Sequence, residues 1–315
     1  SARRDRWGGS GLEVTPPAWG RPIIPSVGLV PTDAEASSSC SENDAAIRIS
    51  SMGKNKLKKF SEMETLPCVF QYPFARVREE GFPLKGRWGS GYFHNDNPIV
   101  LELGCGKGEY TVGLAARYPD RNYIGIDIKG ARMWHGAMQA HGQQMGNVAF
   151  LRTNIELLPS FFAPGEVSEI WITFPDPQMK KARKRLTSTR FVNLYRQVCR
   201  DGAVIRLKTD SPFLYAYTRD MLQANGIVPS GDTSDLYAAS SLTDLPEGLK
   251  DIRTYYEQQW LSRGLTIKYL GFAIPAADIV NEPETEPEHD TYRSFSRGVL
   301  QGNVPPPLLT DAASD

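Results

Sequence analysis

The segment from Phe174 to Leu186 places one carboxylate directly before a run of cations. Asp176 lies between two prolines, after an apolar, β-branched stretch that is short enough to be a buried strand. Proline restricts its own backbone and that of the preceding residue, so the turn should hold the Asp176 carboxylate rigidly. This pattern indicates a reaction centre at a strand end, beside a surface for a polyanion. The cations are Lys180, Lys181, Arg183, Lys184 and Arg185.

A glycine-rich turn, residues 104–108, follows one apolar strand candidate and precedes a helix candidate. The third glycine position of the dinucleotide fingerprint is held here by Glu109, and Glu102 precedes the turn. An acid at this place disfavours a pyrophosphate and suits a cationic ligand such as S-adenosylmethionine, which carries an ammonium and a sulfonium group. A helix-capping or salt-bridged acid is the alternative for Glu102. The predicted ligand contacts here are Glu102, Gly104, Gly106 and Gly108.

Two further polar residues follow the next strand candidates. Asp127 ends the stretch 122–127, where an acid is expected to accept hydrogen bonds from a ribose diol. Nicotinamide enzymes share such an acid, so Asp127 alone does not identify the ligand. Asn154 follows the third strand candidate, where its amide could bind an adenine edge; a simple turn residue is the alternative. Together with Glu102, these positions on successive strands favour a nucleoside-containing cofactor.

Strand and helix patterns alternate from Pro98 onward, which predicts an α/β fold with a doubly wound, mostly parallel sheet. Helices are predicted over residues 109–118, 130–141, 188–200 and 212–224. In the third of these, apolar residues recur at the spacing of one buried helix face. Strands are predicted over residues 99–103, 122–127, 147–152, 169–174, 203–208 and 265–272.

The charges balance over the whole chain but are segregated along it. Lys plus Arg and Asp plus Glu both count 36. Residues 170–210 carry ten cations against three acids, whereas residues 278–290 carry acids and no Lys or Arg. The four cysteines form no CxxC pair and the four histidines show no metal-ligand spacing, so we expect no metal site and no disulfide framework. With no long apolar run, we expect a cytoplasmic protein that does not enter the membrane.

Composition divides the chain into three parts. Residues 1–51 are rich in Gly, Pro and Ser without periodicity, which predicts a disordered N-terminal extension. Residues 52–275 should form the catalytic domain. Residues 276–315 form an acidic, Pro-containing tail that we expect to add no core, although residues 292–295 could dock locally.

Several motifs in order resemble the bacterial tRNA (guanine-N7)-methyltransferases, a family of class I S-adenosylmethionine-dependent enzymes. They are the glycine turn at 101–108, Gly125-Ile126-Asp127, Phe174-Pro175-Asp176-Pro177 with Lys180, and Thr254-Tyr255-Tyr256-Glu257. The resemblance covers residues 52–272. It implies a seven-stranded fold, S-adenosylmethionine as donor, and N7 of the guanosine at position 46 in the tRNA variable loop as acceptor. Many relatives have Trp-Pro and a histidine-containing basic run where this chain has Gln178-Met179 and no histidine.

The resemblance also implies roles for single residues. Asp176 is the proposed catalytic residue, and it contacts the cofactor together with Glu102, Asp127 and Asn154. The substrate contacts are implied to be Lys180, Asp210, Thr254 and Glu257. Because phosphate contacts fix register on folded RNA, the remaining cations are predicted to bind the tRNA backbone. Those cations are Lys181, Arg183, Lys184 and Arg185.

Three rival functions stay open at this point. A small-molecule methyltransferase would explain the glycine turn and Asp127 but not the cation run. A non-catalytic RNA-binding module would leave Glu102, Asp127 and Asp176 without a reason to be acidic. A nicotinamide dehydrogenase is disfavoured by Glu102 and Glu109. The sequence leaves both a monomer and a homodimer open.

Overall fold

The computed structural model describes residues 58–238, 245–246 and 248–292 of the 315-residue chain. The predicted disordered extension, residues 1–51, lies outside the described residues. So do residues 293–315, the part of the predicted tail (276–315) that follows Tyr292.

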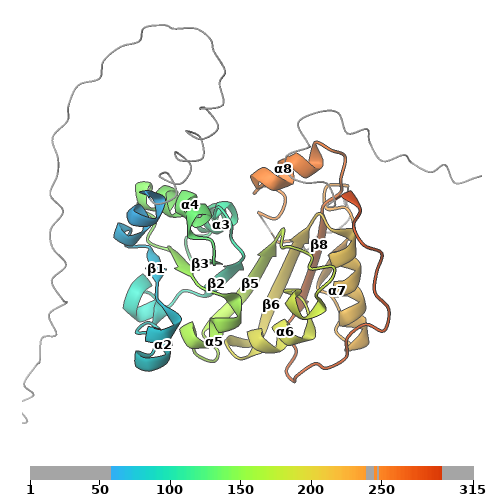
Figure 1. Cartoon of the computed structure of the whole chain (residues 1–315), viewed down its shortest axis with the longest axis horizontal. Coiled ribbons are helices and arrows are strands. Elements are labelled where there is room, and N and C mark those ends of the chain that lie inside the picture. The colour runs from blue at the N-terminus through green and yellow to red at the C-terminus, as the bar shows by residue number, and fades with distance from the viewer. Residues whose placement is uncertain (1–57, 239–244, 247, 293–315) are drawn as a thin grey trace, which may run out of the picture. The chain divides into compact units, whose positions relative to one another are not determined.

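One mostly parallel sheet organises the described part of the chain (Figure 1). It has eight strands in the order β1-β4-β3-β2-β5-β6-β8-β7, and β8 runs antiparallel to both of its neighbours. The doubly wound α/β prediction is confirmed, but the implied count of seven strands is wrong by one because β1 adds to β4 at the edge. The strands are β1 (Val69–Gln71), β2 (Ile99–Leu103), β3 (Asn122–Asp127), β4 (Val148–Arg152), β5 (Val167–Thr173), β6 (Cys199–Thr209), β7 (Gly231–Thr233) and β8 (Lys268–Ala273).

Helices connect the strands and cover both faces of the sheet. The predicted helix over 188–200 is shorter than expected, because β6 already begins at Cys199. The helix ends before this point because the backbone there bonds to β5 instead: the Val167 amide donates to the Val198 carbonyl oxygen at 3.0 Å. The helices are α2 (Phe74–Glu80), α3 (Glu109–Arg117), α4 (Gly130–Gly142), α5 (Leu158–Phe161), α6 (Thr189–Arg196), α7 (Pro212–Ala224) and α8 (Tyr255–Leu261), with short turns η1 (Gly89–Phe93), η2 (Ile155–Leu157) and η3 (Ala182–Lys184).

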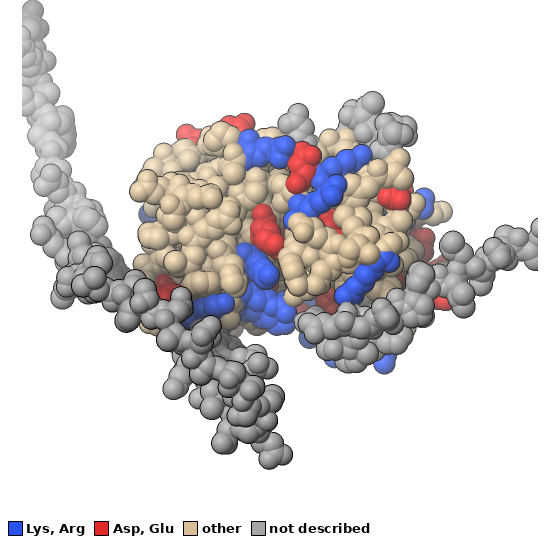
Figure 2. Space-filling model, turned by 90° about the horizontal axis from the view of Figure 1, so that it is seen from above, with Lys and Arg blue, Asp and Glu red and all other residues tan. Residues whose placement is uncertain are grey.

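The carboxyl ends of the parallel strands meet along one edge of the sheet, on the side where α8 lies in Figure 1. Figure 2 views the molecule from that side. Charged side chains of both signs gather along the middle of this face, between two areas of uncharged residues. An edge where parallel strands end is the usual ligand site of open α/β sheets.

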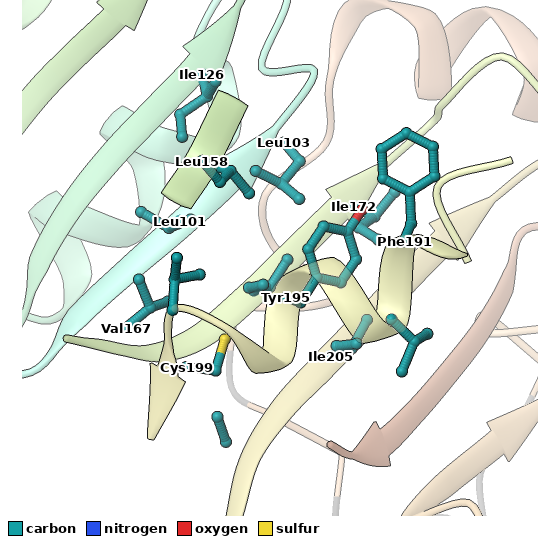
Figure 3. Close-up of a cluster of buried hydrophobic side chains, with 14 of the residues drawn as sticks. Leu101, Leu103, Ile126, Leu158, Val167, Ile172, Phe191, Tyr195, Cys199 and Ile205 are labelled. Atoms are coloured by element: carbon teal, nitrogen blue, oxygen red, sulfur yellow. The ribbon is translucent and has the colours of Figure 1, made fainter. Parts of the chain in front are cut away.

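The core is split into two layers by the sheet, as the twofold alternation of strand side chains requires. On β2, Leu101 and Leu103 point into the layer under α5, α6 and α7, whereas Val100 joins the layer under α3 and α4. Figure 3 shows the first layer, where Tyr195 of α6 packs among side chains of β2, β5 and β6. Burial on both faces explains why the central strands are nearly continuous apolar runs.

The segment after Pro275 packs against the domain. Ile279 is buried and belongs to the core layer under α6 and α7. The Asn193 side chain holds the Ile279 backbone on both sides, donating to its carbonyl oxygen at 2.8 Å and accepting from its amide at 2.9 Å. The expectation that this segment adds no core is therefore wrong at Ile279. Ile279 and Val280 are too short an apolar stretch to produce a periodic signal that the sequence could reveal.

Candidate active site

The glycine turn after β2 has a backbone that other residues rarely adopt. Gly104, Gly106 and Gly108 have φ angles of 75°, 55° and 74°, which place them in the left-handed region that favours glycine. The Asp127 carboxylate fastens this turn to the end of β3: it accepts from the Gly106 amide at 2.9 Å and from the Lys129 amide at 2.8 Å. Asp127 stays partly exposed, so its carboxylate is also accessible to a ligand.

Two glycines of the turn serve different purposes. A Cβ atom at Gly108 would lie 2.7 Å from the Phe150 ring, so this glycine is required by packing. At Gly104 a Cβ atom would meet no protein atom within 4 Å, and the residue is exposed. Gly104 therefore presents bare backbone to open space, where a ligand can approach closely.

Glu102 lies beneath the turn and is only 4% exposed. Its carboxylate accepts from the Thr111 amide at 2.8 Å, from the Thr111 hydroxyl at 2.5 Å, and from the Thr173 hydroxyl at 2.7 Å. Burial raises the pKa of Glu102 to about 7, and the two threonines partly offset that increase. Its contacts connect β2, β5 and the first turn of α3, which matches the helix-capping alternative for this residue.

Glutamine at position 102 should alter how stability depends on pH. Folding raises the pKa of Glu102 from its usual 4.5 to about 7, so the folded state keeps a proton that the unfolded chain has released between these values. Stability should therefore fall as the pH rises from about 4.5 through 7. Glu102→Gln stays neutral and should remove this loss, which is about 3.5 kcal/mol at most at about 1.4 kcal/mol per pKa unit.

Urea denaturation of both proteins between pH 5 and pH 8 measures this effect. The glutamine amide can donate to the Thr173 hydroxyl while its oxygen accepts from Thr111, so the hydrogen bonds survive the change. Parallel pH dependences for the two proteins would contradict the assignment of a raised pKa to Glu102.

The Asp176 turn extends from the carboxyl end of β5 and is held in an unusual conformation. Phe174 and Gln178 have φ angles of 48° and 50°, left-handed values that are uncommon for residues other than glycine. The Asp176 carboxylate is exposed and accepts from the Gln178 amide at 3.0 Å. Such strain persists only where surrounding contacts enforce it, and it is concentrated at functional sites.

The five predicted phosphate-binding cations do not behave alike. Lys180, Lys181, Arg183 and Lys184 are exposed on the loop that follows Asp176. Arg185 is only 3% exposed; its guanidinium donates to backbone carbonyl oxygens of the loop and pairs with Glu286. Arg185 therefore does not face solvent with the other four cations, and its place in the interior is incompatible with the predicted phosphate contact.

Three of the predicted substrate residues are also buried. Asp210 is 0% exposed, and the Tyr292 hydroxyl donates to its carboxylate at 2.6 Å. Thr254 is the N-cap of α8 and accepts from the Glu257 amide at 3.1 Å. The Glu257 carboxylate is 0% exposed and lies 2.7 Å from the Lys208 ammonium nitrogen. Lys180 and Asn154, in contrast, are exposed.

Two further exposed residues lie beside the predicted contacts, and the sequence analysis gave neither of them a role of its own. Tyr255, at the start of α8, is 49% exposed, and its ring lies 4.5 Å from the Lys107 ammonium nitrogen. The Tyr255 amide also donates to the Glu109 carboxylate at 3.0 Å, which joins α8 to the glycine turn. Ile128, directly after Asp127, is 55% exposed. The available sequence signals were the place of Tyr255 within the Thr254-Tyr255-Tyr256-Glu257 motif and the place of Ile128 directly after Asp127.

The residues at this edge fit S-adenosylmethionine. Gly104 offers open backbone, Asp127 offers a partly exposed carboxylate for a ribose diol, and Ile128 offers an exposed apolar surface for a purine. Asp176 adds an exposed negative charge after β5, the strand that pairs with β2 and so ends at the same edge as the glycine turn. This acidic set suits a cationic nucleoside better than a pyrophosphate.

Comparison with known proteins supports the same conclusion. A family profile described as "Putative methyltransferase" matches residues 96–270. Over 246 residues the chain is 59% identical to a Porphyromonas gingivalis protein named tRNA (guanine-N(7)-)-methyltransferase, covering 77% of this chain and 100% of that protein. This chain belongs to the tRNA (guanine-N(7)-)-methyltransferase family. Family members of the same name from Bacteroides fragilis and Christiangramia forsetii are 55% and 48% identical, over 80% and 70% of this chain and 98% of each relative.

Membership of the tRNA (guanine-N(7)-)-methyltransferase family confirms the resemblance seen in the motifs. The chain is accordingly an enzyme, and its methyl donor is S-adenosylmethionine. The nicotinamide dehydrogenase and the non-catalytic RNA-binding module are excluded. Within residues 58–238, 245–246 and 248–292, no helix is both long enough and apolar enough to cross a membrane.

Proposed function

We propose that this enzyme transfers a methyl group from S-adenosylmethionine to N7 of the guanosine at position 46 in the variable loop of tRNA. The observation that supports the proposal most strongly is the Asp176 turn. It follows β5, the strand paired with the one that leads into the glycine turn, and it is followed by four exposed cations. The relatives' shared name points to the same reaction. A reaction on tRNA also fits the expected cytoplasmic location.

For the cofactor, we assign the open backbone of Gly104 and Gly106, the Asp127 carboxylate and the exposed Asn154 amide as direct contacts. Glu102 and Gly108 are assigned an indirect role, because neither is open to the cofactor. Glu102 is buried and hydrogen-bonded to Thr111, and Gly108 packs against the Phe150 ring. The bound cofactor supplies an electrophilic methyl group on a sulfonium ion.

Methyl transfer to guanine N7 requires the two reactants to be positioned and the developing charge to be stabilised, but it requires no proton acceptor. Guanine N7 has an unshared electron pair and no proton, so the transfer is a displacement at carbon that needs no general base. The protein must hold N7 in line with the bond that breaks, which turns an encounter into an oriented reaction. Since the methylated base is cationic, a nearby carboxylate stabilises the charge that develops on the purine. We assign this role to Asp176, which is exposed and held by the Gln178 amide.

We assign the tRNA backbone contacts to Lys181, Arg183 and Lys184, and a direct substrate contact to Lys180. All four are exposed on the loop after Asp176. Asp210, Thr254 and Glu257 shape the substrate pocket from below in this proposal. Arg185 is left out because its guanidinium is buried and bonded within the protein.

Alanine at Lys184 should weaken tRNA binding and reduce its salt dependence. Each phosphate contact releases a counterion, so the loss of one contact should lower the slope of log K against log salt by about 1. The measurement is tRNA affinity between 50 and 200 mM salt. Arg200→Ala is the matched control, because Arg200 is exposed at the opposite edge, near the start of β6. Equal slopes for Lys184→Ala and the wild type would argue against the phosphate contact.

Transfer of labelled methyl to unmodified tRNA tests the whole proposal. Label should appear in tRNA and map to N7 of guanosine 46, and a tRNA with adenosine at that position should accept none. Labelling that appears only with small-molecule acceptors would favour the remaining rival, a small-molecule methyltransferase. Labelling at another nucleotide would overturn the proposed position.

A further inference from the structure

Residues 276–292, called here the C-terminal strap, run along α6 and α7 toward the edge that carries the active site (Figure 1). Its first half is fastened to both helices. Asp278 pairs with Arg196 of α6, and Glu282 accepts from the Tyr217 hydroxyl of α7 at 2.5 Å. Ile279 anchors the strap in the core. The strap is therefore an integral layer of the enzyme over these residues.

The second half of the strap reaches the loop that carries Asp176. The Asp290 carboxylate accepts from the Phe213 amide at 3.0 Å, at the start of α7. The Asp290 amide lies 3.2 Å from the Met179 sulfur and donates to it. Glu286, between these anchors, pairs with the buried guanidinium of Arg185. The strap thus contacts the loop at both Met179 and Arg185.

Arg185 connects Glu286 of the strap to the Asp176 turn. Its guanidinium donates to the Gln178 carbonyl oxygen at 3.3 Å and to the Met179 carbonyl oxygen at 2.9 Å. It also lies between two aromatic rings, 4.7 Å from the centre of Phe213 and 4.4 Å from that of Tyr217. A planar guanidinium with several fixed donors suits such a site better than an ammonium group does.

The residue that Arg185 holds is the strained one. Gln178 has a left-handed backbone, and its amide donates to the Asp176 carboxylate at 3.0 Å. A non-glycine residue keeps that conformation only when its surroundings enforce it. The chain of contacts therefore runs from Glu286 through Arg185 to the Gln178 turn and then to Asp176.

We propose that Glu286 is a positioning residue for Asp176 and acts through Arg185. The inference rests on the proposed function, because it assigns a purpose to the orientation of the Asp176 carboxylate. A buried guanidinium that loses its carboxylate partner is left with an uncompensated charge. It moves toward water and releases the two carbonyl oxygens that fix the turn. Met179, next to Gln178, places its sulfur against the strap.

Glu286→Ala in the full chain tests this role. We expect kcat for tRNA methylation to fall about 10-fold or more, because small errors in orientation cost large factors in rate. The KM for tRNA and the affinity for S-adenosylhomocysteine should stay within about twofold of wild type, since neither the exposed cations nor the glycine turn is altered. Glu284→Ala, which removes an exposed acid from the same segment, should leave all three quantities unchanged.

Arg185→Lys separates positioning from charge alone. Lysine keeps a cation opposite Glu286, but its single ammonium group does not reproduce the fork that reaches both carbonyl oxygens. We expect kcat to fall as in Glu286→Ala. A kcat within twofold of wild type in both variants would overturn the proposal. So would a loss that appears only in the KM for tRNA, since that would make Glu286 and Arg185 part of tRNA binding.

Trypsin cleavage after Lys180, Lys181, Arg183 or Lys184 gives a second measurement that does not depend on activity. Glu286→Ala should be cleaved in this loop several-fold faster than Glu284→Ala or wild type at a temperature where all are folded. Equal cleavage rates would overturn the proposed role of the Glu286–Arg185 contact, even if the wild type does not methylate tRNA. A wild type that does not methylate tRNA but shows the expected cleavage difference would instead overturn the proposed function and leave the contact intact.

Discussion

Asparagine at position 176 is expected to lower kcat for tRNA methylation by about 100-fold or more. The asparagine oxygen still accepts from the Gln178 amide, so the turn keeps its geometry while the charge is removed. Loss of one preorganised electrostatic contact at a reaction centre costs about 100-fold to 1,000-fold in kcat. Alanine at the same position should be more damaging still, because it also removes the acceptor that holds the strained Gln178 backbone.

Single-turnover methyl transfer with saturating tRNA and cofactor is the measurement for both Asp176 variants. Asp201→Asn is the matched control, since Asp201 is an exposed acid near the start of β6, at the opposite edge of the sheet. Affinity for S-adenosylhomocysteine, measured separately, shows whether Asp176 also holds the cofactor. Near-normal turnover of Asp176→Asn would remove Asp176 from the reaction centre.

Glutamine at position 257 is expected to reduce the free energy of unfolding by about 3–5 kcal/mol, the usual cost of removing one partner from a buried ion pair. Glu257 and Lys208 are both 0% exposed, and their charged atoms lie 2.7 Å apart. The Lys208 ammonium group also donates to the Tyr110 hydroxyl at 2.8 Å and to the Leu249 carbonyl oxygen at 2.6 Å. Without the Glu257 charge, the buried Lys208 ammonium group has only neutral acceptors around it.

The loss in Glu257→Gln should shrink as the pH rises. Burial lowers the pKa of Lys208 from 10.5 to about 8, and the Glu257 charge partly offsets that decrease. Between these values the unfolded chain binds a proton that the folded protein has released, so stability rises with pH. Removing the Glu257 charge lowers the pKa of Lys208 in the folded protein further. The pH range over which stability rises is therefore wider in the variant than in the wild type.

Urea denaturation at pH 7 and pH 9 checks both statements about Glu257. Glu80→Gln is a control for an exposed ion pair, with Arg76, and should change stability little. The double variant Lys208→Met with Glu257→Gln should recover much of the loss, because no buried charge remains. A loss below about 1 kcal/mol in Glu257→Gln would show that water reaches the pair in solution.

The parts of the fold that could be predicted from sequence are those with strong local patterns. The helix predicted over 212–224 has the observed limits, because Pro212 opens it and its apolar face is continuous. The strands β1 and β7 were missed, since each has three residues and too little pattern to detect. The two strands are defined by their pairing with β4 and β8, which is a tertiary contact.

The same division applies to the residues of the site. The sequence by itself determined the glycine turn, the acid at the end of β3 and the Asp176 turn, because glycine, proline and strand ends impose their geometry locally. Only the tertiary structure separated Arg185 from the four cations beside it, since all five are identical in charge along the chain. Packing between Phe213 and Tyr217 and pairing with Glu286, 101 residues away, removed Arg185 from the surface. Burial depends on which distant side chains meet, and a linear pattern of charges does not contain that information.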